Sequence, residues 1–283
     1  MNKNSLILHF SVLLLSFPAL FARGLDLVAL VIIWWRCFFA FIFLQIFFLI
    51  KPKKKIPTDS YKWLIFSGLL LGLHWWMFFS SIQLSNVSLG LITFFTFPIF
   101  GIFIEAAVFR TKINLYQIIR ALGVIMGVYI LVPAFTLENN ITKGILLGLL
   151  AALFYVIRMI VIKKCLVKIS TINILYYQLI VACLVISLPF LSNTHQFIFP
   201  SGTELILLML LASIFTLGSH GLMVYTLKCF SVTTVGIVGA LEVIYASILA
   251  AFIFKEIPDL SFYVGASIIL SSALYELYKN NHN

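Results

Sequence analysis

Charged residues are scarce in this chain. Asp, Glu, Lys and Arg together make up only 10% of its 283 residues, while hydrophobic residues make up 63%. A typical soluble domain has about 25% charged residues, because a soluble fold of this length needs a polar surface. The composition therefore excludes a soluble globular protein and indicates an integral membrane protein.

Acidic residues are the rarer charge: 9 Asp and Glu stand against 19 Lys and Arg, which gives a net charge of +10. A basic chain can indicate nucleic-acid binding, but that function needs a contiguous basic face on a folded domain. Here most of the cations lie in short segments between apolar stretches. We therefore predict no nucleic-acid partner.

The residues that hold metals and cofactors are also few. The 4 cysteines are scattered without metal-ligand spacing, and no acidic cluster suits a metal or a phosphate-handling site. We expect neither a metal nor a cofactor. Ser219 precedes His220 in an apolar stretch, but neighbours on a helix point about 100° apart and cannot form a nucleophile–base pair. We therefore predict that the protein is not an enzyme.

Long apolar stretches are what the chain has in abundance. A helix rises 1.5 Å per residue, so about 20 apolar residues cross the hydrocarbon core of a bilayer, which is about 30 Å thick. A backbone surrounded by lipid must be helical or part of a closed barrel. We predict an all-α integral membrane protein with ten transmembrane helices. The expected spans are Ser5–Ala22, Leu27–Ile50, Tyr61–Ile82, Val87–Val108, Leu115–Pro133, Lys143–Lys163, Thr171–Leu191, Thr203–Leu227, Val232–Phe254 and Ser261–Tyr278.

The ten spans divide into two halves, residues 5–133 and 143–278, which repeat at an offset of 145 residues, the separation of Phe109 and Phe254. Five is an odd number, so the second half must enter the membrane from the opposite side. Inverted repeats of this kind are typical of secondary transporters. The loop at residues 109–112 is purely basic, whereas its counterpart at residues 254–259 is mixed and acidic. Cytoplasmic loops are enriched in Lys and Arg, so this contrast places the two corresponding loops on opposite sides of the membrane, as inversion requires.

The distribution of lysine and arginine predicts the orientation. With the N-terminus inside, 13 of these residues lie in cytoplasmic segments and 3 lie outside. We therefore expect both termini to be cytoplasmic. The inside residues are Lys3, Lys51, Lys53, Lys54, Lys55, Lys62, Arg110, Lys112, Lys163, Lys164, Lys168, Lys228 and Lys279, and the outside residues are Arg23, Lys143 and Lys255.

Motifs at corresponding places in the two halves add a family resemblance. The second span carries Arg36 before an aromatic run, the seventh has Gln178 in its place, and the fourth contains Phe97-Pro98. The ninth contains the stretch 241–246, Leu-Glu-Val-Ile-Tyr-Ala, and closes on Phe-Lys-Glu at 254–256. In order and spacing these motifs resemble the drug/metabolite transporter superfamily, in its ten-helix bacterial branch with two EamA-type domains.

The resemblance implies a carrier that works by alternating access across the bacterial inner membrane, with its substrate between the first four helices of each half. We expect a small organic metabolite, with an amino acid or amino-acid-like compound first and with efflux or exchange ahead of uptake. The second half, notably at residues 187–189 and 254–259, is also similar to S-adenosylmethionine carriers of obligate intracellular bacteria. Uptake of S-adenosylmethionine or another host metabolite is therefore an alternative. A non-transporting membrane partner in lipid or glycolipid translocation is an alternative of another class.

Three charged residues within the expected spans stand out as candidates: Arg36, Arg158 and Glu242. A charge at the centre of a membrane helix costs about 2.5–3.5 kcal/mol on insertion scales, so it should face a cavity or a partner. Glu242 suits either proton coupling or binding of a substrate ammonium. It equally suits a structural ion pair with Arg36 or Arg158. A guanidinium cannot carry protons, which favours a structural role for Arg36.

Histidine and aromatic residues near the middle of the membrane complete the candidate site. A cavity lined by such rings favours an amine, a sulfonium or a flat ring through cation–π and stacking contacts. Ordinary helix packing is the alternative for each residue. The predicted substrate-binding residues are His74, Trp75, Trp76, Phe97, Tyr155, His220, Tyr225, Glu242 and Tyr245. Membrane lipid surrounds such a carrier, proton coupling and exchange both remain open, and a monomer and a homodimer are equally compatible with the sequence.

Overall fold

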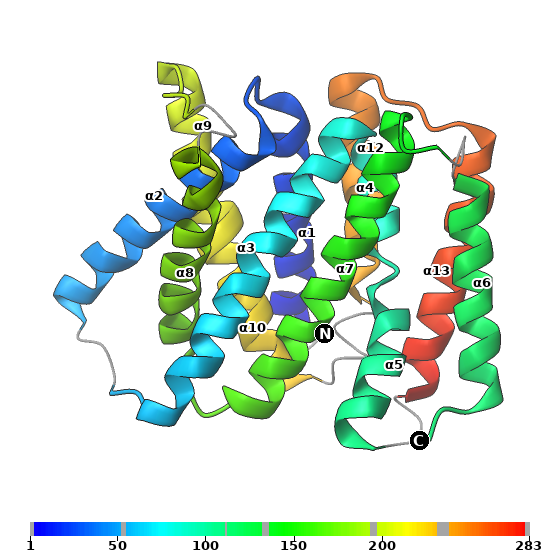
Figure 1. Ribbon diagram of the computed structural model, residues 1–283, viewed down its shortest axis with the longest axis horizontal. Coiled ribbons are helices and arrows are strands. Elements are labelled where there is room, and N and C mark those ends of the chain that lie inside the picture. Colours follow the sequence, from blue (N-terminus) through cyan, green and yellow to red (C-terminus); the bar gives the residue numbers. More distant parts are fainter. Residues whose placement is uncertain are drawn as a thin grey trace.

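Helices form almost all of the computed structural model, which describes residues 3–51, 55–110, 112–131, 136–192, 197–230 and 238–280 (Figure 1). The expected span ends at Pro133 and Val232, and the cations Lys53 and Lys54, lie outside the described residues. The helices are α1 Lys3–Gly24, α2 Ala29–Ile50, α3 Tyr61–Leu84, α4 Val87–Phe94, α5 Phe97–Phe109, α6 Leu115–Leu131, α7 Asn140–Cys165, α8 Thr171–Leu191, α9 Gly202–Ala212, α10 Ser219–Cys229, α12 Leu241–Phe254 and α13 Leu260–Asn280, with short turns η1 Thr58–Ser60 and η2 Ser213–Gly218.

The fourth expected span is not one continuous helix. It is divided into α4 and α5 at Phe95 and Thr96. Pro98 lies in the first turn of α5, where its missing N–H removes no helical hydrogen bond. The Thr96 hydroxyl donates to the carbonyl oxygen of Thr93 at 2.7 Å, which satisfies an acceptor at the end of α4. The proline therefore begins a new helix.

The eighth expected span is also interrupted. Helices α9 and α10 are joined by η2, a π-helical turn of 6 residues. Within it, the Thr216 hydroxyl donates to the carbonyl oxygen of Leu211 at 2.7 Å, which lies five residues earlier. Wide turns of this kind occur mostly as single insertions in α-helices, and frequently at functional sites.

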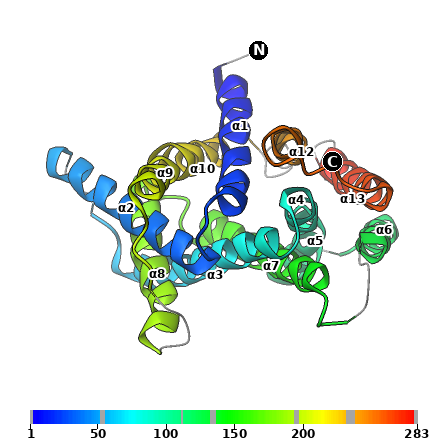
Figure 2. The same ribbon diagram turned by 90° about the horizontal axis from the view of Figure 1, so that it is seen from above.

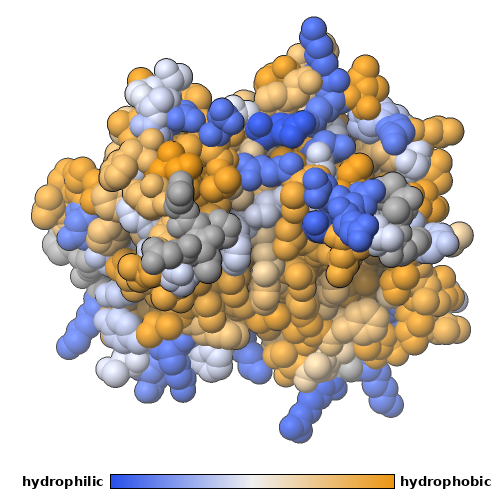
Figure 3. Space-filling view, turned by 45° about the horizontal axis from the view of Figure 1, so that its top comes forward, coloured by the Kyte–Doolittle hydropathy of each residue, from blue (hydrophilic) through white to orange (hydrophobic). Residues whose placement is uncertain are grey.

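The helices confirm a multi-pass membrane protein. Among the described residues, 7 helical segments are long and apolar enough to cross a membrane, counting α4–α5 and α9–α10 as one segment each. Three shorter apolar helices, α6, α12 and α13, complete the set. Hydrophobic side chains cover much of the flank in Figure 3, and hydrophilic ones gather toward its upper face and lower edge. The count of ten spans and the inverted division at residues 133 and 143 remain predictions.

Helices from the two expected halves pack closely together, with α3 against both α7 and α8 (Figures 1 and 2). The glycine pairs at 68 and 72 and at 144 and 148 lie at these contacts. A Cβ on Gly68 would lie 2.7 Å from the Cβ of Val181, and one on Gly144 would lie 2.9 Å from the carbonyl oxygen of Ser81. A Cβ on Gly148 would collide with the side chain of Thr93. Small residues therefore allow the helix backbones to approach.

Helices α6 and α13 form a separate pair at one edge of the molecule (Figure 2). A Cβ on Gly265 of α13 would lie 2.9 Å from the carbonyl oxygen of Gly127 on α6, so these two backbones are also in close contact. The pair packs mainly against itself. The interior of the bundle is therefore built by the other helices.

Polar contacts tie the helices together at one end of the bundle. Arg23, at the end of α1, forms an ion pair of 2.6 Å with Glu256, which follows α12. The other carboxylate oxygen of Glu256 accepts a hydrogen bond from the backbone N–H of Val87, at the start of α4, at 3.2 Å. On α3, the Gln83 side chain accepts a hydrogen bond from the N–H of Ala29 at 2.8 Å and donates to the carbonyl oxygens of Leu27 at 2.8 Å and Ala22 at 3.1 Å. These contacts link α1, α2, α3 and α4 at this end.

Candidate functional site

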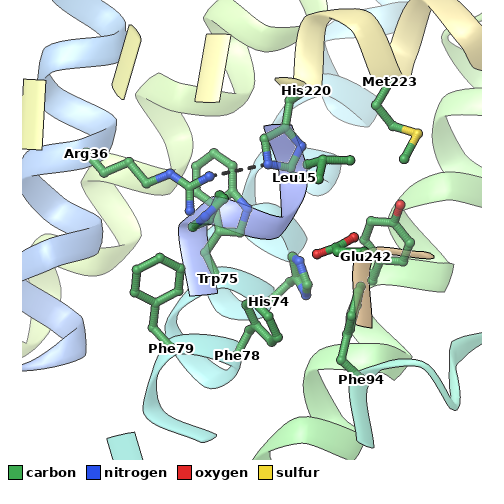
Figure 4. Close-up of a pocket in the computed structure, with 12 residues that line it drawn as sticks. Leu15, Arg36, His74, Trp75, Phe78, Phe79, Phe94, His220, Met223 and Glu242 are labelled. Atoms are coloured by element: carbon green, nitrogen blue, oxygen red, sulfur yellow. Dashed lines mark hydrogen bonds between the residues drawn. The ribbon is translucent and has the colours of Figure 1, made fainter. Parts of the chain in front are cut away.

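A cavity of about 40 Å³ lies inside the bundle, between α1, α2, α3, α4, α7, α10 and α12 (Figure 4). Aromatic rings make up much of its wall, and two charged side chains and two histidines supply its polar groups. The lining residues are Leu15, Pro18, Arg36, His74, Trp75, Phe78, Phe79, Phe94, Tyr155, His220, Met223 and Glu242. Six residues predicted from the sequence, Arg36, His74, Trp75, Tyr155, His220 and Glu242, are therefore brought together here.

Other predicted site residues lie outside this cavity. Trp76 is half-buried, packs against the hydrophobic core and does not line the cavity. Phe97 packs against the ring of Tyr155, with 5.2 Å between the centroids. Tyr225 is 41% exposed and donates to the Asn4 side chain at 3.3 Å. Tyr245 packs against an apolar cluster that contains Val12 and Met223. Arg158, described below, also lies elsewhere.

Arg36 has no carboxylate partner among the residues that the structure describes. Its Nε donates to the hydroxyl of Thr216 at 2.6 Å, and its Nη2 lies 3.3 Å from Nε2 of His220. The guanidinium carbon lies 3.9 Å from the ring centroid of Trp75 and 5.5 Å from that of Phe79. Because guanidinium nitrogens only donate, His220 accepts at Nε2 and is the neutral tautomer with its proton on Nδ1.

Glu242 is the acidic residue of the cavity. Its side chain lies in the first turn of α12, where the helix dipole favours negative charge, and it is 8% exposed. In the part of the chain that the structure describes, its carboxylate has neither a hydrogen bond nor an ion pair. Figure 4 shows it across the cavity from Arg36, with the Trp75 ring between them. The ion pair with Arg36 or Arg158 that the sequence suggested is therefore not formed.

Arg158 belongs to a different, structural network. It is buried, and its Nη2 donates to Oε1 of Gln178 at 2.9 Å. Gln178 in turn donates to the hydroxyl of Ser67 at 2.9 Å, which joins α7, α8 and α3. The sequence suggested that Arg158 could reach the inside surface. Its burial in this network shows that it does not, because neighbouring helices cover it and supply its partner.

The two histidines, which the repeat places at nearly matching positions, both line the cavity. His74 donates through Nδ1 to the carbonyl oxygen of Ala151 at 3.0 Å. Its ring lies 5.1 Å from that of Tyr155 and 5.2 Å from that of Phe94, centroid to centroid. His74 is thus fixed by α7, whereas His220 is fixed by Arg36 of α2.

Sequence reasoning missed several residues of the site. Phe78, Phe79 and Phe94 line the cavity but are three among 28 phenylalanines, so no pattern marked them. Thr216 was missed because its role depends on η2, which turns its hydroxyl toward Arg36 while still bonding its own helix. Neither the π-helical turn nor the distance between α2 and η2 has a sequence signal.

Comparison with known proteins identifies the family. The sequence model of the EamA-like transporter family matches this chain twice, at residues 5–132 and 142–276. The chain belongs to the EamA-like transporter family. It is therefore a small-molecule membrane transporter and not an enzyme.

Several curated relatives of this EamA-like chain share one name. The "S-adenosylmethionine uptake transporter" of Rickettsia felis is 32% identical over 252 residues, covering 86% of this chain and 81% of the relative. The protein of the same name from Rickettsia prowazekii is 30% identical over 250 residues, with the same coverage. A crystal structure of another protein superposes with a TM-score of 0.67 over 99% of both chains, at 14% identity, which shows a shared fold.

Proposed function

We propose that this EamA-like protein carries S-adenosylmethionine, or a closely similar metabolite, into a bacterial cell across the inner membrane by alternating access, with both termini in the cytoplasm. The names of the Rickettsia relatives favour this substrate over the simple amino acid that the sequence put first. S-adenosylmethionine still carries an amino-acid group, together with a positively charged sulfonium and an adenine ring.

The observation that carries this proposal is Glu242, a buried carboxylate without a partner among the described residues, at a cavity walled by aromatic rings. A sulfonium or ammonium ion brought into this site would supply the missing positive charge. The rings of Trp75, Tyr155 and Phe94 would add cation–π attraction or stack on a flat ring. The same wall would favour an anionic or purely apolar solute far less.

The size of the cavity indicates that the site opens during transport. Its volume is about 40 Å³, whereas pockets that enclose ligands of this size measure about 300–1,000 Å³. The helices must therefore separate before a substrate enters. The ion pair of Arg23 with Glu256 lies at the end that we assign to the outside. A site this small is consistent with a carrier between two open states.

Counterflow with the purified protein in liposomes tests the proposal. Vesicles are preloaded separately with unlabelled S-adenosylmethionine, methionine or a polyamine, and uptake of the matching labelled solute is followed. We expect accumulation with S-adenosylmethionine and none in protein-free vesicles. Accumulation of methionine alone would return the function to amino-acid transport. Silence across the panel from folded, correctly inserted protein would refute the proposal and favour a helper in lipid or glycolipid translocation.

A further inference from the structure

Arg36 is a buried cation that has no counter-charge in the described part of the chain. Its side chain is 1% exposed, and its contacts are the neutral Thr216 and His220 and the rings of Trp75 and Phe79. Within the described ranges, the single ion pair joins Arg23 and Glu256 and does not involve Arg36. A buried charge without a partner is costly, and the guanidinium cannot relieve that cost by losing its proton. Arg158 is also buried without a carboxylate partner among the described residues, but of the two only Arg36 lines the cavity, so only its charge is available to a bound substrate.

The guanidinium also retains hydrogen-bonding capacity toward the cavity. It carries five N–H donors, and its two polar contacts use one at Nε and one at Nη2. Thr216 fixes its orientation, because the threonine hydroxyl is itself anchored to the carbonyl oxygen of Leu211 in η2. The remaining donors are held in place beside the cavity that Arg36 lines. A planar guanidinium matches a carboxylate, because it can donate two parallel N–H hydrogen bonds to the two carboxylate oxygens.

We propose that Arg36 is the subsite for the carboxylate of the transported metabolite, opposite a Glu242 subsite for its positive charge. The inference rests on the proposed function. It adds the orientation of the bound substrate between Arg36 and Glu242. Figure 4 shows the two charged groups on opposite sides of the cavity, separated by the Trp75 ring. The amino-acid group of S-adenosylmethionine then faces α2 and η2, and a positive centre faces α12.

His220 strengthens the assignment. As the acceptor of the Nη2 hydrogen bond it is neutral, so it adds no second positive charge beside Arg36. It also lies 5.2 Å, centroid to centroid, from the Trp75 ring that covers the guanidinium. An incoming carboxylate therefore meets one oriented cation in a largely apolar wall, where a charge-assisted hydrogen bond is stronger than in water.

Analogues that lack one charge test the subsite. In proteoliposomes, uptake of labelled S-adenosylmethionine is inhibited with decarboxylated S-adenosylmethionine, which lacks the carboxylate, and with S-adenosylhomocysteine, which keeps it but lacks the sulfonium. We expect the wild-type protein to bind S-adenosylmethionine about 10- to 100-fold more tightly than the decarboxylated analogue, the range for a lost hydrogen bond to a charged group. The ratio of the two affinities is the readout, because it does not depend on how much protein is folded.

Three variants separate binding from folding. In Arg36→Gln the preference for the carboxylate should fall to about one. Thr216→Val, which keeps the charge but removes its orienting acceptor, should reduce the preference partially. Arg158→Gln is the matched control, a second buried arginine outside the cavity, and should leave the ratio unchanged even where total transport falls.

The outcomes distinguish the two proposals. Inhibition by decarboxylated S-adenosylmethionine as strong as that by S-adenosylmethionine itself in the wild type, or a full preference retained in Arg36→Gln, would overturn the Arg36 subsite while leaving S-adenosylmethionine transport in place. Failure of the wild-type protein to exchange S-adenosylmethionine at all would remove the proposed function, and the Arg36 subsite with it.

Discussion

Glu242→Gln should separate stability from transport. The carboxylate is 8% exposed and has no partner among the described residues, so its charge contributes no contact that holds the fold. Ionised groups in such surroundings cost several kcal/mol, whereas glutamine has the same shape without the charge. We therefore expect the unfolding temperature to stay the same or to rise; a gain of about 1 kcal/mol corresponds to roughly 2–4 °C for a chain of this size.

Transport by Glu242→Gln, unlike its stability, should be impaired. A sulfonium donates no hydrogen bond, so its attraction to Glu242 is ionic. Removing one partner of a buried ion pair costs about 3–5 kcal/mol, so losing the carboxylate should raise the KM for S-adenosylmethionine by about 100-fold or more. Counterflow gives the KM, and loss of monodispersity on heating gives the stability. Glu105→Gln, the same change at a half-buried glutamate outside the cavity, is the control. A Glu242→Gln protein that unfolds earlier but keeps its KM would refute the reasoning, and unchanged transport across a pH series would exclude proton coupling through this residue.

Further predictions concern helix packing, the ion pair of Arg23 with Glu256, and the orientation of the chain in the membrane. Gly148→Ala should lower the free energy of unfolding by about 1–2 kcal/mol through overpacking, whereas Gly101→Ala, with nothing within 4 Å, should raise it by up to about 1 kcal/mol in thermal denaturation. A double-mutant cycle with Arg23→Gln and Glu256→Gln should give a coupling of about 0.2–1 kcal/mol that disappears in concentrated salt; a larger, salt-insensitive coupling would contradict a partly exposed pair. In a cysteine-free background, an impermeant thiol reagent should label Arg23→Cys from outside intact cells and Lys55→Cys only after permeabilisation; the reverse pattern would invert the assigned orientation.

Much of the helix pattern could be predicted, because an apolar run long enough to cross a bilayer has one stable conformation. The interruptions at Thr96 and in η2 could not, because both depend on local hydrogen bonds that leave the composition unchanged. Pro98 marked the first break but not whether the chain would kink or begin a new helix. Only the three-dimensional packing decides this.

The candidate site was predictable where charge or polarity was out of place in a membrane. Arg36, Glu242 and His220 are conspicuous in apolar helices, and all three line the cavity. Arg158 is equally conspicuous but lies in a separate network, because it is almost one turn further along α7 than Tyr155 and meets Gln178 of α8 there. A pairing such as Arg36 with Thr216 joins residues 180 positions apart. Their contact depends on how α2 and η2 meet, which one sequence does not reveal.

The glycine-lined contact between α3 and α7 limits how this carrier can move. At Gly144 and Gly148 the two helices meet through backbone and short side chains, without long side chains that could adjust to a gap. Separating them would leave a void in a closely packed interior. We therefore expect the contact between α3 and α7 to persist when the cavity widens, and α1 and α12, which also line the cavity, to move instead.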